Sequence, residues 1–494
     1  MKGKLYIFGI GGTGSRVLRS LAMLAASGVK MEAEAIVPII IDPDHANADV
    51  TRAVEQLKRY QTIRESLTFD GSGSNRFFRP AFQQTVSDYR LRLNDTRNKR
   101  FREFIGFDTL SENNRALASI LFSTHNLEAK MEVGFKGNPN IGSVVLNQFD
   151  ESQDFDDFSN AFRPEDRIFI VSSIFGGTGA SGFPLLLKKL RENNSSVKNS
   201  KAIGEAPIGA ISVLPYFKVR PSDDSEIDSA SFIGKTKAAL QYYDRSVAGE
   251  HSSVNMMYYI GDRRNNIYEN CEGGDHQKNN AHLVEFAAAQ AIVDFMNIED
   301  DNEVLRCEQD SLQRTCAPYA QFKEYGIEED VETVLFSTLG PEVQRMLFAP
   351  MTQFLLMGKY MQERFPQNRN LVKRQPWVHS LGLKEAFWSS DFNTILRNFL
   401  SEYIEWLAEL ADNDRSFAPY NLGVSGRRLY DIVNGKDASQ DGMKGYFTPQ
   451  GIDLMDAQLN RECGKLAKSA PKEQRFMELF FIVTQHLVEK KYQE

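Results

Sequence analysis

Two glycine-rich segments of the chain have the composition of phosphate-binding loops. They are Gly9-Ile-Gly-Gly-Thr-Gly-Ser15 and Gly176-Gly-Thr-Gly-Ala-Ser-Gly182. Because glycine lacks a Cβ atom, such a backbone can approach an anion closely and present it to the N-terminus of a following helix. The competing interpretation is a tight turn that binds nothing. The residues expected to hold phosphate are Gly11, Gly12, Thr13, Gly14, Ser15, Gly176, Gly177, Thr178, Gly179, Ala180 and Ser181.

A third glycine-rich segment occupies residues 134–142. Its Gly137 and Asn138 suit a tight backbone whose donors point at a terminal phosphate, and Lys136 adds a positive charge. The competing interpretation is a plain surface turn. If all three segments meet, they describe one nucleotide pocket.

Two carboxylates, Asp42 and Asp44, directly follow the apolar run at residues 35–41. A carboxylate at the carboxyl end of a buried parallel strand lies where ligands bind in open α/β sheets. We therefore expect Asp42 or Asp44 to contact a ribose, or a magnesium ion through water. The alternative is that both are turn formers beside the intervening proline.

Short apolar runs alternate with segments of helical composition over the first 300 residues. This alternation predicts an α/β fold with a doubly wound, mainly parallel sheet, in which the glycine segments and Asp42 converge at one edge. Ser15 is expected to cap a helix that begins at Arg16. The expected strands are 4–8, 35–41, 168–171, 207–214 and 255–260, and the expected helices are 16–26, 48–67, 110–122, 143–149, 185–191, 235–244 and 279–297.

The length of 494 residues exceeds a single typical core, so we expect more than one domain. Residues 1–300 should form the nucleotide domain, with a helical insertion at about 50–130. Residues 301–340 should connect it, through short strands, to a mostly helical domain at 341–494. This helical region is also expected to be where partner proteins bind.

The composition excludes several classes of protein. A net charge of −8 argues against a chain devoted to nucleic acid. The four cysteines are scattered and form no CxxC pair, which argues against structural zinc, and no metal-ligand cluster is expected. Neither a secretion signal nor an apolar run of about 20 residues is visible. A cytoplasmic protein without a membrane span is expected.

The combination of segments resembles the tubulin/FtsZ superfamily of GTPases over roughly residues 1–305. The segment 176–182 resembles the phosphate signature GGGTGSG of that family, the segment 9–15 resembles its first glycine loop, and the segment 137–142 resembles the FtsZ loop beside the terminal phosphate. Asn280-Ala-His-Leu-Val284 resembles the start of the central helix of tubulin. The four segments also follow one another in the family order.

The resemblance implies that the ligand is GTP or GDP, with Mg²⁺ bridging phosphate oxygens. Asp262 stands where the family usually places a guanine-reading asparagine, and a carboxylate there can accept from guanine N1–H and N2–H together. Tyr216 is implied to lie near the ribose, and Asn280 in the nucleotide site at the start of the central helix.

The resemblance also implies a split catalytic site. In this family the acidic loop of one subunit completes the GTP site of the next, so hydrolysis needs head-to-tail self-association into a filament. Asp300 and Asp301 are the candidates for positioning the attacking water, with Glu299 third.

Departures from the family pattern mark a divergent, bacterial member. Phe175 replaces the first glycine of the signature, and Ser181 takes the place of its last glycine. One alternative keeps the fold and drops polymerisation, leaving a GTP-dependent switch or scaffold in a bacterial multi-protein system. A second alternative is an E1/ThiF-like adenylating enzyme that uses ATP, because the first glycine loop and Asp42 also resemble that family.

Overall fold

The computed structural model describes most of the chain between residues 3 and 492. The residues outside the description are 45, 72, 95, 97–98, 132–134, 136–137, 193, 220–228, 248–252, 264–266, 269–273, 275–277, 299–330, 366–371, 437 and 439–448, together with the two at each end. Within the described part, no helix is long and apolar enough to cross a bilayer.

A five-stranded sheet forms the centre of the nucleotide region, and all its strand pairs are parallel. Its order is β2-β1-β3-β4-β6, so the chain first adds a strand on one side of β1 and then continues on the other side. The fold class expected from the sequence, a doubly wound α/β fold, is confirmed. The strands are β1 (Leu5–Ile10), β2 (Ile36–Ile41), β3 (Arg167–Ser173), β4 (Ile208–Val213) and β6 (Met256–Ile260).

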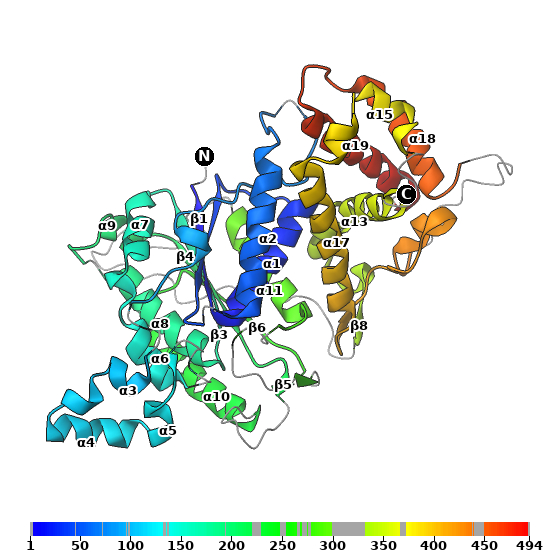
Figure 1. Ribbon diagram of the computed structural model, residues 1–494. Helices are drawn as coiled ribbons and strands as arrows, with labels where there is room; N and C mark the ends of the chain where they lie inside the picture. Colours follow the sequence, from blue (N-terminus) through cyan, green and yellow to red (C-terminus); the bar gives the residue numbers. More distant parts are fainter. Residues whose placement is uncertain are drawn as a thin grey trace, which may run out of the picture.

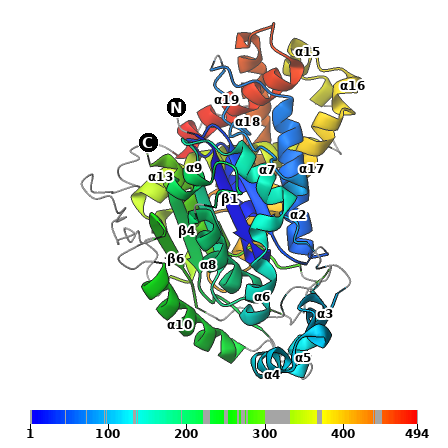
Figure 2. The same cartoon turned by 90° about the vertical axis from the view of Figure 1, so that its left-hand side faces the viewer.

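Helices cover both faces of this sheet, which is why its first four strands are buried along their full length. One layer contains α1 (Gly11–Ser27), α2 (Ala48–Glu65) and α11 (Leu283–Asn297) (Figure 1). Figure 2 shows the opposite layer in front of the strands. It contains α6 (Pro139–Leu146), α7 (Gln153–Ala161), α8 (Gly177–Arg191) and α9 (Ser200–Glu205), with α10 (Ser229–Ser246) beyond them.

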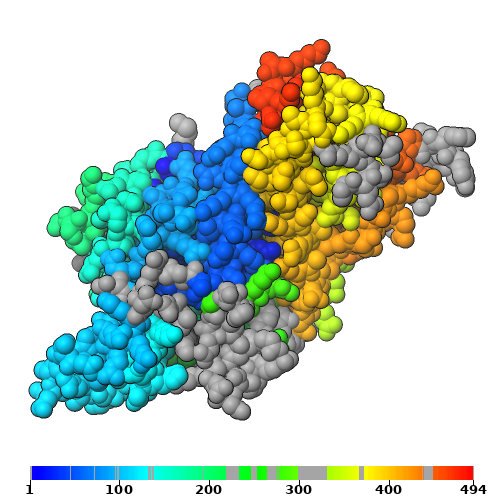
Figure 3. Space-filling view, viewed as in Figure 1, coloured from blue at the N-terminus to red at the C-terminus, as the bar shows by residue number. Residues whose placement is uncertain are grey.

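The stretch expected as a helical insertion at about 50–130 has three structural parts. Helix α2 packs on α1 within the core layer. Residues 81–91 then run parallel to β2 through isolated bridges of Ile36 with Phe82 and Ile40 with Arg90. Only the last part projects from the body (Figure 3). It contains α3 (Phe101–Phe104), α4 (Glu112–Leu121) and α5 (Thr124–Leu127).

The C-terminal region is helical, as expected, and packs on the α1–α2 layer. Tyr60 and Phe78 meet Phe399 of α17, and the Trp406 indole donates to the Ser20 hydroxyl of α1 at 3.3 Å. The helices are α13 (Pro341–Arg364), α15 (Pro376–Ser380), α16 (Glu385–Trp388), α17 (Asp391–Ala411), α18 (Ile452–Glu462) and α19 (Lys472–Tyr492).

Two small parallel ribbons and several 3₁₀ turns complete the described elements. The ribbons pair β5 (Lys218–Val219) with β7 (Ile267–Tyr268) and β8 (Thr333–Val334) with β9 (Ser416–Phe417). The 3₁₀ turns are η1 (Ser87–Tyr89), η2 (Phe107–Thr109), η4 (Phe149–Glu151), η5 (Phe336–Thr338), η6 (Gly426–Ile432) and η7 (Cys463–Lys465).

Most of each glycine segment is helical, which corrects the sequence-based boundaries. Helix α1 begins at Gly11 and α8 at Gly177, whereas the sequence predicted starts at 16 and 185. Ser15 therefore lies inside α1 and is not its cap; its hydroxyl bonds the carbonyl of Gly11 at 3.2 Å. Tertiary packing overrides the low helix propensity of glycine, because a Cβ on Gly14 would lie 2.4 Å from the carbonyl carbon of Gly9.

This packing makes Gly14 far less tolerant of a side chain than Gly12. We expect Gly14→Ala to lower the free energy of unfolding by about 1–3 kcal/mol or more, since the clash is with backbone. Gly12→Ala is the matched control, because its Cβ would meet nothing closer than 3.4 Å and alanine favours helix by up to about 1 kcal/mol. Chemical denaturation measures both; equal stability of the two variants would contradict this packing.

Candidate functional site

The N-termini of α1 and α8 lie side by side at the switch point of the sheet, because β1 and β3 are neighbours. Their N-cap residues are Ile10 and Gly176, and neither helix has a side-chain cap among the described residues. Neither has an acidic residue in its first turn. The free N–H groups and the positive ends of two helix dipoles therefore favour an external anion.

The neighbouring helices α2 and α11 show what ordinary capping looks like in this protein. The Asn47 carboxamide oxygen accepts from the first turn of α2, with the Asp49 N–H at 2.9 Å. His282 and Glu285 form a capping box at the start of α11. Other helices, such as α13 and α18, also lack a side-chain cap within the described part of the chain. The N-termini of α1 and α8 are distinguished by their place at the switch point of the sheet, where ligands bind in open sheets.

Glycine allows the first turns of the two uncapped helices to approach each other. Gly11 has a φ of 72°, which disfavours any residue with a side chain, and a Cβ built on it would lie 3.7 Å from the Cβ of Thr178. In α8, a Cβ on Gly179 would lie 2.5 Å from the carbonyl oxygen of Ser173. Glycine therefore has two roles here. It leaves open the site between the first turns of α1 and α8, which we call the glycine cradle, and it allows these helices to pack on the strands beneath.

The third glycine-rich segment reaches the same place through α6. Asn138 caps α6, accepting from the Asn140 N–H at 3.1 Å. A Cβ on Gly142 would lie 2.1 Å from the Oγ of Ser181, so α6 packs tightly against the first turns of α8. Gly137 is outside the described residues. The Ser181 hydroxyl donates to the Gly177 carbonyl at 2.7 Å, within its own helix.

Beneath the first glycine segment, Arg16 is buried in a ring of polar partners that the sequence did not indicate. Its guanidinium meets Glu285 at 2.5 Å, Asp49 at 2.7 Å and the Tyr216 hydroxyl at 3.0 Å. It also reaches the Thr13 hydroxyl at 3.4 Å. Burial lowers the pKa of Arg16, and the charges of Glu285, Tyr216 and Asp49 reverse this effect, so the guanidinium stays charged.

The ring continues from the glycine segment to the C-terminal helices. The Asn279 side chain and backbone N–H donate to Asp49 at 3.0 and 3.1 Å. Glu409 of α17 accepts from Arg19 of α1 at 2.6 Å and from the Ala281 N–H at 2.8 Å. A continuous set of buried polar contacts thus joins α1, α2, α11 and α17.

His282 at the start of α11 completes this polar layer as a neutral side chain. Burial lowers its pKa to about 3, and the nearby charge of Arg16 acts in the same direction. Its Nδ1 can therefore accept from the Val284 N–H at 3.1 Å as a helix cap. His282 therefore adds no positive charge beside Arg16.

Asp42 and Asp44 lie at the carboxyl end of β2. Burial raises the pKa of Asp42 to about 7, and the charge of Asp44 adds to the rise although the Asp44 N–H opposes it. Asp44 accepts from the Gly274 N–H at 2.6 Å. No group of three or more His, Cys, Asp or Glu suited to a metal occurs in the described part of the chain.

The other predicted binding residues occupy different environments. Tyr216 is fully buried, and its hydroxyl donates to Glu285 at 2.5 Å. Asp262 forms an ion pair with Arg415 at 2.8 Å. Asn280 is exposed, and its neighbour Asn279 makes the contact with Asp49.

The candidate catalytic residues Glu299, Asp300 and Asp301 lie outside the described residues. The structure does place the end of the helix that precedes them. Asn297, the last residue of α11, donates to the Lys30 carbonyl at 3.0 Å and accepts from the Glu32 N–H at 3.0 Å. Lys30 and Glu32 belong to the α1–β2 connection, so α11 runs from the glycine edge of the sheet to the opposite edge.

Similar solved structures exist, but no protein-family model and no curated protein matches the sequence. CetZ2 from Haloferax volcanii, a GTPγS-bound protofilament, is 13% identical with a TM-score of 0.29, covering 59% of this chain and 58% of that one. CetZ1 from Haloferax volcanii, a GDP-bound monomer, is 15% identical with a TM-score of 0.30, covering 61% and 63%. CetZ from Methanosaeta thermophila is 17% identical with a TM-score of 0.23, covering 63% and 56%. The chain spans less than two thirds of each of these structures.

The ring around Arg16 predicts a large loss of stability when its centre is removed. Arg16→Met leaves Glu285 buried without its cation and leaves Asp49 with Arg52 alone among the described cations, which we expect to cost about 3–5 kcal/mol. Arg52→Met is the matched control, because Arg52 pairs with the same Asp49 but is partly exposed, and such pairs contribute up to about 1 kcal/mol.

Chemical denaturation at several pH values measures these costs. The deficit of Arg16→Met should shrink as the pH falls, because the stranded carboxylates then bind protons and lose their charge. Equal losses for the two variants, or a deficit that does not change with pH, would contradict the role assigned to Arg16.

Proposed function

We propose that the protein binds GTP at the paired N-termini of α1 and α8 and hydrolyses it in a head-to-tail assembly, as a tubulin/FtsZ-like GTPase. The observation that carries the proposal is the pair of adjacent helix N-termini without side-chain caps at the switch point of the sheet. A polyphosphate supplies the acceptors that these N–H groups lack within the described residues.

The residues present fit a nucleoside triphosphate. Gly11 places no side chain between the two helix ends, and the first turns carry no carboxylate that would repel phosphate. The N-terminus of α6 adds Asn138 beside α8. Mg²⁺ usually takes one or two carboxylates together with phosphate oxygens, a role that Asp42 and Asp44 suit. When bound, Mg²⁺ supplies positive charge to the transferring phosphate.

Recognition of the guanine base is assigned to Asp262, with its ribose near Tyr216. Among the described contacts, Arg415 Nε donates to Oδ1 of the Asp262 carboxylate. A carboxylate can accept from guanine N1–H and N2–H, a pair of donors that adenine lacks. Preference for ATP in binding would contradict this assignment and favour an adenylating enzyme.

The position of α11 supports catalysis between subunits. Glu285, at the glycine edge, and Asn297, at the opposite edge, are twelve residues apart, which corresponds to about 18 Å of helix. The four residues from 298 to 301 span at most about 14 Å when fully extended. We expect so short a loop to contact the next copy in preference to the glycine edge of its own copy.

In the proposed reaction, the acidic loop of one copy acts on the GTP of another. In a head-to-tail contact, the residues after Asn297 face the phosphates of the next copy. Asp300 and Asp301, with Glu299 third, orient a water that attacks the γ-phosphorus; its proton passes to a carboxylate or to phosphate while the bond to the β–γ bridging oxygen breaks. The first-turn N–H groups of α1 and α8 stabilise the charge on the phosphate oxygens.

A contact of this kind joins two different faces of the same chain, so repetition without closure generates a filament. The CetZ structures matched above are a GTPγS-bound protofilament and a GDP-bound monomer. For this chain, the proposal depends on its own loops and on α11. The C-terminal helices, joined to α1 through Glu409, are the surface assigned to other protein partners.

A mixing experiment tests the split site. Asp300→Asn/Asp301→Asn should bind GTP and not hydrolyse it. Gly11→Ala should lose GTP binding, because a methyl group enters the cradle, at a cost in stability of about 1–2 kcal/mol for its left-handed backbone. An equimolar mixture should recover hydrolysis, since the acidic loop of Gly11→Ala completes the GTP site of Asp300→Asn/Asp301→Asn in the next copy.

Phosphate release and GTP binding are measured for each variant and for the mixture. A mixture as inactive as its components would overturn catalysis between subunits. Hydrolysis by the loop variant alone would show that other residues position the water, and GTP binding by Gly11→Ala would refute the cradle.

A further inference from the structure

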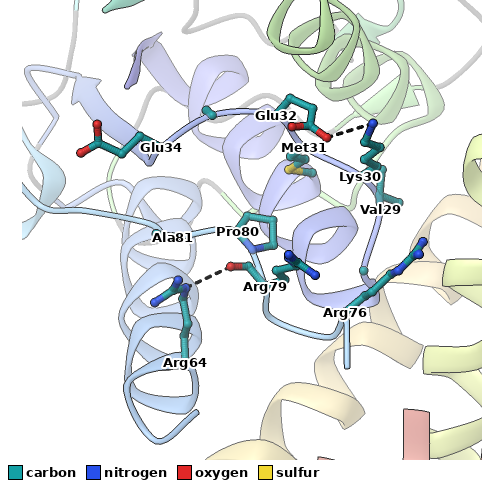
Figure 4. Close-up of a pocket in the computed structure, with 12 residues that line it drawn as sticks. Val29, Lys30, Met31, Glu32, Glu34, Arg64, Arg76, Arg79, Pro80 and Ala81 are labelled. Carbon is teal, nitrogen blue, oxygen red and sulfur yellow. Dashed lines mark hydrogen bonds and ion pairs between the residues drawn. The ribbon is translucent and has the colours of Figure 1, made fainter. Parts of the chain in front are cut away.

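A cavity lies at the edge of the sheet opposite the glycine segments. It has a volume of about 430 Å³, within the range of small-molecule sites. One wall is the α1–β2 connection from Gly28 to Glu34, and the other is formed by residues 76, 79, 80 and 81 with Arg64 of α2 (Figure 4). None of its lining residues belongs to the proposed GTP site.

The cavity is strongly basic although the chain as a whole is acidic. Lys30, Arg64, Arg76 and Arg79 line it, against Glu32 and Glu34. Both carboxylates have cationic partners, since Glu32 pairs with Lys30 at 2.9 Å and Glu34 with Arg163 at 2.6 Å. The positive charge of the three arginines is therefore not neutralised by the acidic lining residues.

Two of these arginines have unused donors. Arg64 donates from Nε to the Arg79 carbonyl at 3.2 Å and stacks over Phe69. The guanidinium groups of Arg76 and Arg79 have no hydrogen-bond or ion-pair partner among the residues that the structure describes. Each guanidinium presents a planar set of donors that matches the oxygens of a phosphate group.

The backbone between these arginines is held firmly. Phe77 and Phe78 are fully buried against Phe354, and Phe78 adopts a φ of 58°, which is rare for a bulky residue. Gly28, with a φ of 90°, lets the Arg76 backbone approach, because a Cβ on it would lie 3.1 Å from the Cβ of Arg76. The two phenylalanines point inward, which leaves Arg76 and Arg79 at the cavity.

We infer that this cavity is a binding site for a phosphate-type oxyanion, held by Arg76 and Arg79 with Arg64 beside them. The site is distinct from the glycine cradle, which offers backbone N–H groups at the other edge of the sheet. It also touches the assembly face, because Lys30 and Glu32 hold Asn297. The phosphate belongs either to a free small molecule or to the nucleotide of the next copy.

Titration calorimetry at low salt tests the site, with pyrophosphate as the probe and GDP in excess so that the glycine cradle is occupied. Arg76→Gln/Arg79→Gln should weaken pyrophosphate binding at least about tenfold, because two charge-assisted contacts are lost. Arg427→Gln/Arg428→Gln is the matched control, since both residues are exposed on η6, and it should bind as the unaltered protein does.

The two sources of phosphate give different results. Binding of pyrophosphate to dilute protein identifies a free ligand. A change confined to the concentration dependence of GTP hydrolysis identifies the phosphate of the neighbouring copy. If Arg76→Gln/Arg79→Gln matches the control in both measurements, the inference is wrong. GTP binding at the glycine cradle should be unaffected in either variant, so failure here is separable from failure of the proposed function.

Discussion

The buried ion pairs of Arg16 are the constraint on which the arrangement of the site depends. A guanidinium this far from solvent is tolerable only when its donors are matched, and Glu285, Asp49 and Tyr216 match them from three separate elements. The ring fixes α1, α2 and α11 relative to one another directly beneath the first glycine segment. The same set of buried polar contacts therefore positions the first glycine segment and attaches the C-terminal helices.

The glycine segments satisfy two demands at once. Gly14 and Gly179 are required by the strands behind them, where any side chain would strike backbone, whereas Gly11 keeps the space in front open. The N-termini of α1 and α8 lie next to each other at the switch point of the sheet without side-chain caps, which favours a ligand that completes these helix ends.

Local sequence pattern was sufficient for the fold class and for most elements. The expected strands lie in one parallel sheet, and α11 ends at Asn297, where the expected helix 279–297 ends. The starts of α1 and α8 were missed because propensity treats glycine as a helix breaker, whereas close packing on β1 and β3 decides these positions. The ring around Arg16 gave no local signal, because Arg16 and Glu285 are 269 positions apart and only the folded topology brings them together. An arginine directly after a glycine motif was the one available clue.

Hydrogen–deuterium exchange of the backbone amides, with and without GTP, tests the central claim that two helix ends share one phosphate ligand. GTP should protect residues 11–15 and 177–181 together, while the capped N-termini of α2 and α11 change little. Protection of neither segment, or of only one of them, would contradict the shared site.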